Sequence, residues 1–266
     1  MEEIVIYINS KDNSKFKLAK SLLKTKNRNK EKKYLAEGLR TVELAIQYKA
    51  DIEFIFISQN FAKNDLNKKN ISKFDKYADL YILANDLFQS LSTTENTQGV
   101  LSVMRMNSLS IDEIKERDLK KILVLDRVQD PGNVGTIVRT ADAAGFDLLI
   151  FNKGCVDVYN PKVVRSAMGS MFYMDMAFLE DIQIEKLLKE DNMQIVSSSL
   201  DTENYYDKIN FKEKVALVVG NEANGISEFW KERSDVLVKI PMYGKAESLN
   251  VAISSAILMY VINANK

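Results

Sequence analysis

The residues of this sequence best suited to chemistry lie around a turn that follows a short apolar run. Asp130–Asn133 is a turn cluster between the run Ile122–Leu125 and a segment with the pattern of a helix. Arg139 lies six positions after Asn133, and helical side chains lean toward the helix N-terminus, so its guanidinium can reach back over the turn. Because an arginine side chain stays protonated in proteins, it is a poor general base. Its charge instead suits the stabilisation of a developing oxyanion.

The segments around this turn predict the order strand, loop, helix, strand. Ile122–Leu125 and Leu148–Phe151 are short apolar runs, and the helix between them has Asn133 as its expected N-cap and Gly145 as its end. Short connections of this kind form a βαβ unit and predict a parallel sheet. The turn then lies at the carboxyl end of a strand, where open α/β sheets bind their ligands.

Two later segments also place polar residues after an apolar strand. In Val215–Ile226 the strand ends at Gly220, and the loop that follows carries Glu222. In Val238–Ala252 a short strand leads to a long apolar helix, expected over residues 248–262 with Ser248 as its cap.

These three segments together resemble the motifs of the SpoU (TrmH) branch of the SPOUT RNA methyltransferases. Asn133, Gly135 and Arg139 match motif 1, and Asp126, Gln129 and Pro131–Gly132 precede them as in the family. Val215–Ile226 resembles motif 2 and Val238–Ala252 resembles motif 3, in the same order and with matching internal spacing. The resemblance covers residues 121–266 closely and the N-terminal part more loosely.

The resemblance implies a fold, a reaction and an assembly. The fold is the SPOUT α/β knot, a parallel sheet with a deep trefoil knot, and the cofactor is S-adenosylmethionine, bent within the knotted loops. The reaction is methyl transfer to a ribose 2′-hydroxyl of RNA, which needs no metal, and the assembly is a homodimer.

The resemblance also assigns the cofactor-binding residues, which are Gly220, Ile240 and Leu249. Backbone groups at these positions would hold the adenosine, and a glycine after a buried strand permits close backbone approach. Simple packing in the core is the structural alternative for Ile240 and Leu249.

The catalytic residues that the resemblance implies are Arg139, Asn133, Glu222, Ser248 and Asn250. Arg139 would engage the target ribose and phosphate, either as a base or as an electrostatic stabiliser, and the others would line the site. Ordinary structural roles are open for each of them. A surface salt bridge suits Arg139, helix capping suits Asn133, Ser248 and Asn250, and Glu222 suits the start of a helix over residues 227–233.

Composition excludes several other classes of protein. The 266 residues suffice for two domains, with 46% hydrophobic and 28% charged residues as in ordinary globular proteins. The absence of histidine rules out Ser-His and Cys-His hydrolases. The single cysteine, Cys155, rules out an internal disulfide and a Cys-pair zinc site, and we interpret it as an inert apolar residue.

The location expected from these features is the cytoplasm. A single cysteine fits a reducing compartment, and the acidic, polar start of the chain is unlike a signal peptide. The sequence contains no apolar run of about 18 residues, so no contact with a membrane is expected.

The sequence predicts that residues 1–106 form a separate RNA-binding domain, a small α/β sandwich. A linker at residues 107–120 would join this domain to the catalytic domain of residues 121–266. Tyr34–Arg40 and Thr94–Val100 resemble the opening and the closing strand of the substrate-binding domain that precedes many SpoU catalytic domains and is similar to ribosomal proteins that bind kinked RNA. The segment Lys11–Lys33 holds ten basic and two acidic residues, which suits either a polyanion or a solvated helix.

The helix expected over residues 160–170 gives a further set of candidate RNA contacts, because Asn160, Lys162 and Arg165 could meet phosphate. A surface role for this helix is the alternative.

The sequence therefore predicts a 2′-O-ribose methyltransferase of 23S rRNA, with tRNA as the alternative substrate. A non-catalytic RNA-binding or ribosome-assembly protein on the same fold is the alternative function. A doubly wound nucleotide-binding enzyme lacks support because the G-x-G-x-x-G pattern is absent. A base methyltransferase of the TrmD type is disfavoured by the motif from Asn133 to Arg139.

Overall fold

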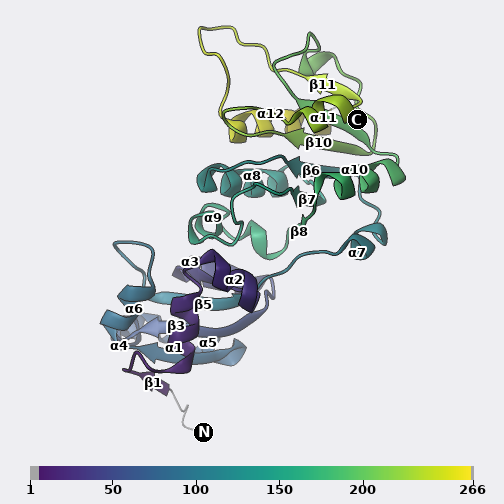
Figure 1. The fold of residues 1–266 in the computed structure, drawn as a ribbon. Coiled ribbons are helices and arrows are strands. Elements are labelled where there is room, and N and C mark those ends of the chain that lie inside the picture. Colours follow the sequence, from purple (N-terminus) through teal and green to yellow (C-terminus); the bar gives the residue numbers. More distant parts are fainter. Residues whose placement is uncertain (1–5, 265–266) are drawn as a thin grey trace. The chain divides into compact units, whose positions relative to one another are not determined.

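The computed structural model describes residues 6–264, which form two compact units (Figure 1). The N-terminal unit comprises the chain up to Met106 together with Tyr159–Tyr173, and the C-terminal unit comprises Asn107–Val158 and the chain from Met174 onward. The segment expected as a linker, 107–120, groups with the C-terminal unit and contains helix α7 (Ile111–Lys115).

The N-terminal unit is built on a five-stranded sheet with the order β1-β4-β3-β5-β2. Strands β1, β4 and β3 are parallel, and β5 runs antiparallel to its neighbours β3 and β2. The strands are β1 (Ile6–Ile8), β2 (Lys33–Glu37), β3 (Ile52–Ser58), β4 (Asp79–Leu83) and β5 (Val100–Arg105). The helices are α1 (Ser14–Ser21), α2 (Thr25–Glu31), α3 (Leu39–Gln47), α4 (Gln59–Lys63), α5 (Lys68–Tyr77), α6 (Asn85–Leu91) and α9 (Pro161–Ser166), with 3-10 turns η1 (Asp65–Asn67) and η2 (Ser170–Phe172).

Apolar clusters cover both faces of this sheet, so the predicted layered α/β domain is present. Helices α1 and α6 bury side chains on one face, and α3, α4 and α5 do so on the other. The helix expected over residues 160–170 is shorter than predicted. Asn160 caps it by accepting a hydrogen bond from the amide of Lys162, so Asn160 has a structural role here.

The basic segment Lys11–Lys33 forms two helices, α1 and α2. Arg28 in α2 is buried, and its guanidinium donates to the carbonyl of Leu22 and to Thr25 Oγ1. Arg28 therefore closes the turn between the two helices, and its charge is not exposed to a polyanion.

The C-terminal unit contains a six-stranded, fully parallel sheet with the order β11-β9-β10-β6-β7-β8. The predicted parallel sheet is confirmed. Its strands are β6 (Lys121–Leu125), β7 (Leu148–Phe151), β8 (Asp175–Phe178), β9 (Gln194–Ser198), β10 (Val215–Val219) and β11 (Val236–Val238). Its helices, besides α7, are α8 (Pro131–Ala143), α10 (Asp181–Glu190), α11 (Glu228–Arg233) and α12 (Val251–Ala264), with a 3-10 turn η3 (Tyr206–Lys208).

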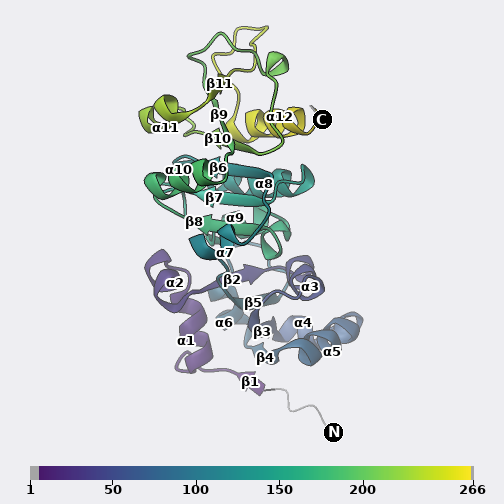
Figure 2. The same ribbon diagram turned by 90° about the vertical axis from the view of Figure 1, so that its right-hand side faces the viewer.

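Helices cover both faces of this sheet, with α8 and α12 on one face and α10 and α11 on the other (Figure 2). All five residues of β10 are buried, as expected for a central strand of a covered parallel sheet. The trefoil knot that the resemblance implies stays a prediction. Within residues 6–264, no helix is both long and apolar enough to cross a membrane.

The register of the central strands determines where a site can form. Strands β6 and β10 are parallel neighbours, and Leu125 at the end of β6 pairs with Val219 at the end of β10. The chain leaves β6 toward β7 on one side, whereas β10 and β9 lie on the other side. This reversal of strand order is the place where open α/β sheets bind ligands, and it brings the loops after Leu125 and Val219 together.

We expect Leu217→Ala to destabilise the C-terminal unit by about 2–5 kcal/mol, because Leu217 is fully buried in the central strand and its loss leaves a cavity. Urea denaturation followed by the fluorescence of Trp230, the single tryptophan, measures this. Leu66→Ala is the control, because Leu66 is 87% exposed. Equal small effects of the two substitutions would contradict the assigned core.

Candidate active site

Helix α8 begins at Pro131, and its N-cap is Asp130, not the expected Asn133. The Asp130 carboxylate accepts a hydrogen bond from the amide of Asn133 at 2.8 Å, and Pro131 occupies the first turn. An aspartate followed by proline suits the cap better, because proline at the first helical position needs no amide partner. The Asn133 side chain then serves as a bridge, donating from Nδ2 to Glu222 at 3.0 Å and accepting at Oδ1 from Asn250 at 2.9 Å.

Glu222 projects from the loop after β10 onto the start of α8. Its carboxylate accepts hydrogen bonds from the amides of Gln129 at 3.2 Å and Asp130 at 3.1 Å, as well as from Asn133. Burial alone would raise the pKa of Glu222, but these hydrogen bonds outweigh burial and lower the pKa below its ordinary value. Glu222 is therefore an anion at the N-terminus of α8, where the helix dipole favours it, and not at the start of α11 as the structural alternative expected.

Asn250 caps helix α12, a role that Ser248 was expected to have. The helix begins at Val251, and Asn250 Oδ1 accepts from the amides of Ala252 at 2.9 Å and Ile253 at 3.4 Å. Ser248 precedes the helix in an exposed loop, too far along the chain to reach the first helical amides. Asn250 thus joins α12 to Asn133, and a polar row runs from Glu222 through Asn133 to Asn250.

A cavity of about 360 Å³ is lined by Glu222, the first member of this row, and by the rest of the loop after β10. The segments that line it follow β9, β10 and β11 and lead into α12. All three expected cofactor-binding residues line it, together with two of the expected catalytic residues: Gly220, Ile240, Leu249, Glu222 and Ser248.

The core-packing alternative for two of these residues is wrong. Leu249 is 36% exposed and Ile240 is half-buried, so both border the cavity and neither belongs to the core.

Gly220 is required by the loop itself. A Cβ at this position would lie 2.1 Å from the carbonyl carbon of Gly225 and 2.2 Å from the nitrogen of Ile226. The loop folds back on itself through paired backbone hydrogen bonds between Asn221 and Gly225, both of 2.9 Å. The close backbone approach expected at Gly220 is therefore made by Gly225 and Ile226 of its own loop. This loop forms a wall of the cavity.

The lining of the cavity suits S-adenosylmethionine in its chemistry. Val219, Ile226, Ile240 and Met242 provide apolar surface for a base, and exposed strand-end backbone groups can pair with its edge. Charged side chains lie at the margin. Among them, Lys231 is held 3.1 Å from Asp201 and can meet the polar end of such a ligand. Within residues 6–264, no group of three or more His, Cys, Asp or Glu is placed to hold a metal.

Arg139 does not line the cavity. It lies on α8 six residues beyond Asn133, with an exposed side chain. The structure therefore brings Asn133, Glu222 and Asn250 into one hydrogen-bonded row, whereas Arg139 is exposed on α8 and is not part of this row.

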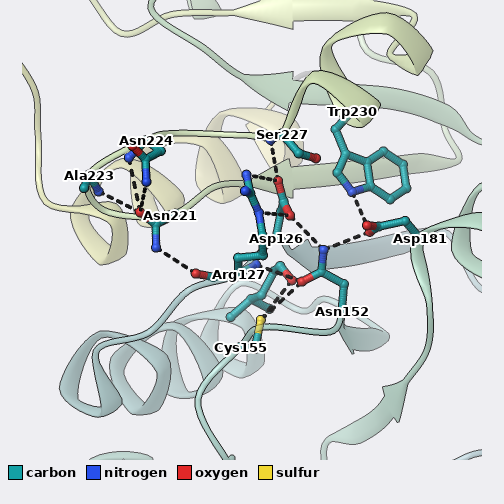
Figure 3. Close-up of polar contacts among 11 residues, drawn as sticks. Asp126, Arg127, Asn152, Cys155, Asp181, Asn221, Ala223, Asn224, Ser227 and Trp230 are labelled. Atoms are coloured by element: carbon teal, nitrogen blue, oxygen red, sulfur yellow. Dashed lines mark hydrogen bonds and ion pairs between the residues drawn. The ribbon is translucent and has the colours of Figure 1, made fainter.

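Sequence reasoning assigned no role to a buried polar cluster under these loops (Figure 3). The cluster contains three residues that come first or second after a parallel strand, namely Asp126, Asn152 and Asn221. Asn152 Nδ2 donates to the Asp126 carboxylate, and Asn221 Nδ2 donates to the carbonyl of Arg127. Their position after apolar strands was the available signal. Cys155 lies in this cluster, and burial raises the pKa of its thiol to about 12, which agrees with the inert role expected for it.

We expect the stabilisation by Glu222 to depend on pH. Because its pKa is lowered in the folded state, the stabilisation is present above the ordinary pKa of about 4.5 and is lost as the pH falls through the folded value. Since the side chain is partly exposed, Glu222→Gln should lower the free energy of unfolding by only about 1 kcal/mol near neutral pH.

Urea denaturation of wild type and Glu222→Gln across this range measures the difference, which should shrink below about pH 4. Glu228→Gln is the matched control, because Glu228 is exposed and its nearest cation is Lys231 on the same helix. A difference that is the same at all pH values would contradict the role of the carboxylate.

Comparisons with known proteins indicate the family of this chain. The sequence matches the model of the SpoU rRNA Methylase family over residues 120–260 and that of the MRM3-like substrate binding domain over residues 13–102. It is 34% identical to the 23S rRNA (guanosine(2553)-2'-O)-methyltransferase RlmP of Bacillus subtilis, over 95% of this chain and 97% of that protein.

Two solved structures are similar over almost the whole chain. An RNA 2'-O ribose methyltransferase has a TM-score of 0.80 at 29% identity, covering 98% of this chain and 99% of its own. The SpoU methyltransferase AviRb from Streptomyces viridochromogenes, solved in complex with the cofactor AdoMet, has a TM-score of 0.85 at 26% identity, covering 94% and 97%.

The α/β fold and the methyltransferase class expected from the motifs are thereby confirmed. A family model that spans more than half of the sequence, and a relative of 34% identity along nearly its full length, show that this chain belongs to the SpoU rRNA methylase family.

Proposed function

We propose that this chain transfers a methyl group from S-adenosylmethionine to a ribose 2′-hydroxyl of 23S rRNA. The observation that carries the proposal is the contact between the cavity and the polar row. Glu222 lines the cavity and is also hydrogen-bonded to Asn133, which in turn contacts Asn250. A cofactor in the cavity and a hydroxyl at the row would therefore meet at one loop.

The residues of the row and of α8 have separable roles in this proposal. When bound, S-adenosylmethionine supplies an electrophilic methyl group on a sulfonium. Glu222 stays ionised at neutral pH, and it orients Asn133 through its hydrogen bond of 3.0 Å. Arg139, exposed on the same helix, binds the phosphate beside the target ribose and stabilises the negative charge that develops on the ribose oxygen as its proton passes to solvent. Ser248, at the mouth of the cavity, contacts the hydroxyl.

Ribosomal RNA is the favoured substrate because the relatives of high coverage act on it. The B. subtilis relative carries 23S rRNA in its name, as does a methyltransferase of S. viridochromogenes that is 28% identical over 93% of this chain. In this proposal residues 1–106 select the RNA, which the match to a substrate-binding domain supports. Exposed lysines of α1 and α2, such as Lys26 and Lys30, would contact its phosphates.

We further propose that the protein acts as a cytoplasmic homodimer. Helix α12 is largely apolar, yet Ile253 is 52% and Tyr260 is 53% exposed, which suits burial against a second copy. The thiol of Cys155, kept protonated by burial, is compatible with a reducing compartment.

Methyl transfer from radiolabelled S-adenosylmethionine to total bacterial RNA, followed by mapping of alkali-resistant 2′-O-methyl sites, tests the proposal. We expect label at one ribose of 23S rRNA. Arg139→Ala should lower kcat by about 10²–10³, the usual cost of losing a group that stabilises an oxyanion, while cofactor binding is kept. Arg117→Ala is the matched control, because Arg117 is an exposed arginine of the same unit that pairs with Asp175 at the opposite edge of the sheet.

The other outcomes are equally informative. Label confined to tRNA would overturn the substrate but keep the chemistry. Cofactor binding without transfer to any RNA would favour a non-catalytic assembly factor. Unchanged kcat in Arg139→Ala would contradict the role given to that side chain.

A further inference from the structure

A fully buried carboxylate lies beneath the cavity wall, on a residue that precedes motif 1 and has no part in the proposed reaction. Asp126 is the first residue after β6 and has no exposed surface. A buried charge is costly unless it is paired and hydrogen-bonded, so its partners indicate what it holds in place.

The two oxygens of Asp126 reach three different segments (Figure 3). Oδ1 accepts from Asn152 Nδ2 at 2.7 Å and from Arg127 Nε at 3.0 Å. Oδ2 accepts from the backbone amide of Ser227 at 2.5 Å. Asp126 thus connects the loops that follow β6, β7 and β10.

The contact with Ser227 matters because this residue ends the loop that walls the cavity. The other end of the loop is anchored by the same segment: the Asp126 amide donates to the carbonyl of Val219 at 2.8 Å, and Asn221 Nδ2 donates to the carbonyl of Arg127 at 2.9 Å. Arg127 has a φ of +57°, an unfavourable conformation for a non-glycine residue, and this conformation accompanies these contacts. Both ends of the cavity wall are therefore fixed by residues 126 and 127.

We propose that Asp126 is a positioning residue for the cofactor site, and that it acts through the amide of Ser227. This inference rests on the proposed function of the cavity as the S-adenosylmethionine site. Loss of the carboxylate releases one end of the loop that lines the cavity, whereas the contacts of Glu222 with Gln129 and Asp130 remain. Cofactor affinity should therefore fall more than the rate at saturation.

An intrinsic fluorophore, Trp230, is hydrogen-bonded to this network. Trp230, the single tryptophan, is fully buried and lies just after the loop, in α11. Its Nε1 donates to Asp181 at 3.0 Å, and the same Asp181 oxygen accepts from Asn152 at 2.8 Å (Figure 3). Its fluorescence should therefore respond to changes in the cluster, while calorimetry measures cofactor binding directly.

The test is a titration of the full-length protein with S-adenosylmethionine, followed by Trp230 fluorescence and by isothermal calorimetry. Asp126→Asn keeps the shape but replaces an acceptor by an amide group facing donors, and we expect Kd to rise about tenfold or more with a smaller fall in kcat. Ser227→Pro removes the amide donor together with a buried hydroxyl that makes no hydrogen bond, and the φ of −68° at Ser227 suits proline. It should raise Kd in the same way.

Asp147→Asn is the matched control. The Asp147 carboxylate accepts from the amides of Lys120 and Lys121, both at 2.8 Å, at the amino end of the same strand β6. It should lower stability without changing Kd or kcat.

A rise in Kd for Asp126→Asn and Ser227→Pro, but not for Asp147→Asn, supports the positioning role. If Asp126→Asn binds the cofactor with the wild-type Kd and only its unfolding midpoint falls, the positioning role is overturned and Asp126 has a structural role alone. Absence of S-adenosylmethionine binding by the wild-type protein overturns the proposed function, and this inference with it.

Discussion

The rest of the site depends on two carboxylates from neighbouring loops, each of which accepts hydrogen bonds from backbone amides of the other loop. Glu222, from the loop after β10, accepts from the amides of the loop after β6. Asp126, at the start of the loop after β6, accepts from the amide that ends the loop after β10. Hydrogen bonds to a buried charged group such as Asp126 contribute about 1.5–3 kcal/mol each, whereas the exposed Glu222 contributes only about 1 kcal/mol. Such a pair can hold two irregular segments in one arrangement.

This arrangement is possible because β6 and β10 are parallel, adjacent and in register up to Leu125 and Val219. One result is the cavity, one wall of which is the loop after β10. Gly220 allows this loop to fold back on itself. The other result is the exposed start of α8, where Asn133 lies between Glu222 and Asn250. A molecule with no histidine can thus build a polar site from carboxylate, amide and guanidinium groups alone.

The larger features of the fold and site followed from local chemistry in the sequence. Short apolar runs such as Leu148–Phe151 predicted buried parallel strands, and polar residues directly after them predicted the edge where the site forms. Gly220, Ile240 and Leu249 were placed by the motif pattern, and all three border the cavity.

The misplaced residues share one physical reason. Helix caps depend on competition among neighbouring polar side chains, so Asp130 displaced Asn133 and Asn250 displaced Ser248 as the residues that meet the first helical amides. The role of Asp126 was hidden for a related reason. Its partner Ser227 lies about a hundred residues away in the chain, and only the register of β6 and β10 brings the two together.

Site-resolved amide hydrogen exchange on the wild-type protein tests the central claim most directly. The amides of Gln129 and Asp130 lie outside regular structure in exposed residues, and that of Ser227 ends a loop, so only the two carboxylates explain protection there. Our account predicts slow exchange at all three amides. Exchange as fast as in the exposed loop at residues 243–247 would show that the two loops are not joined, and would contradict it.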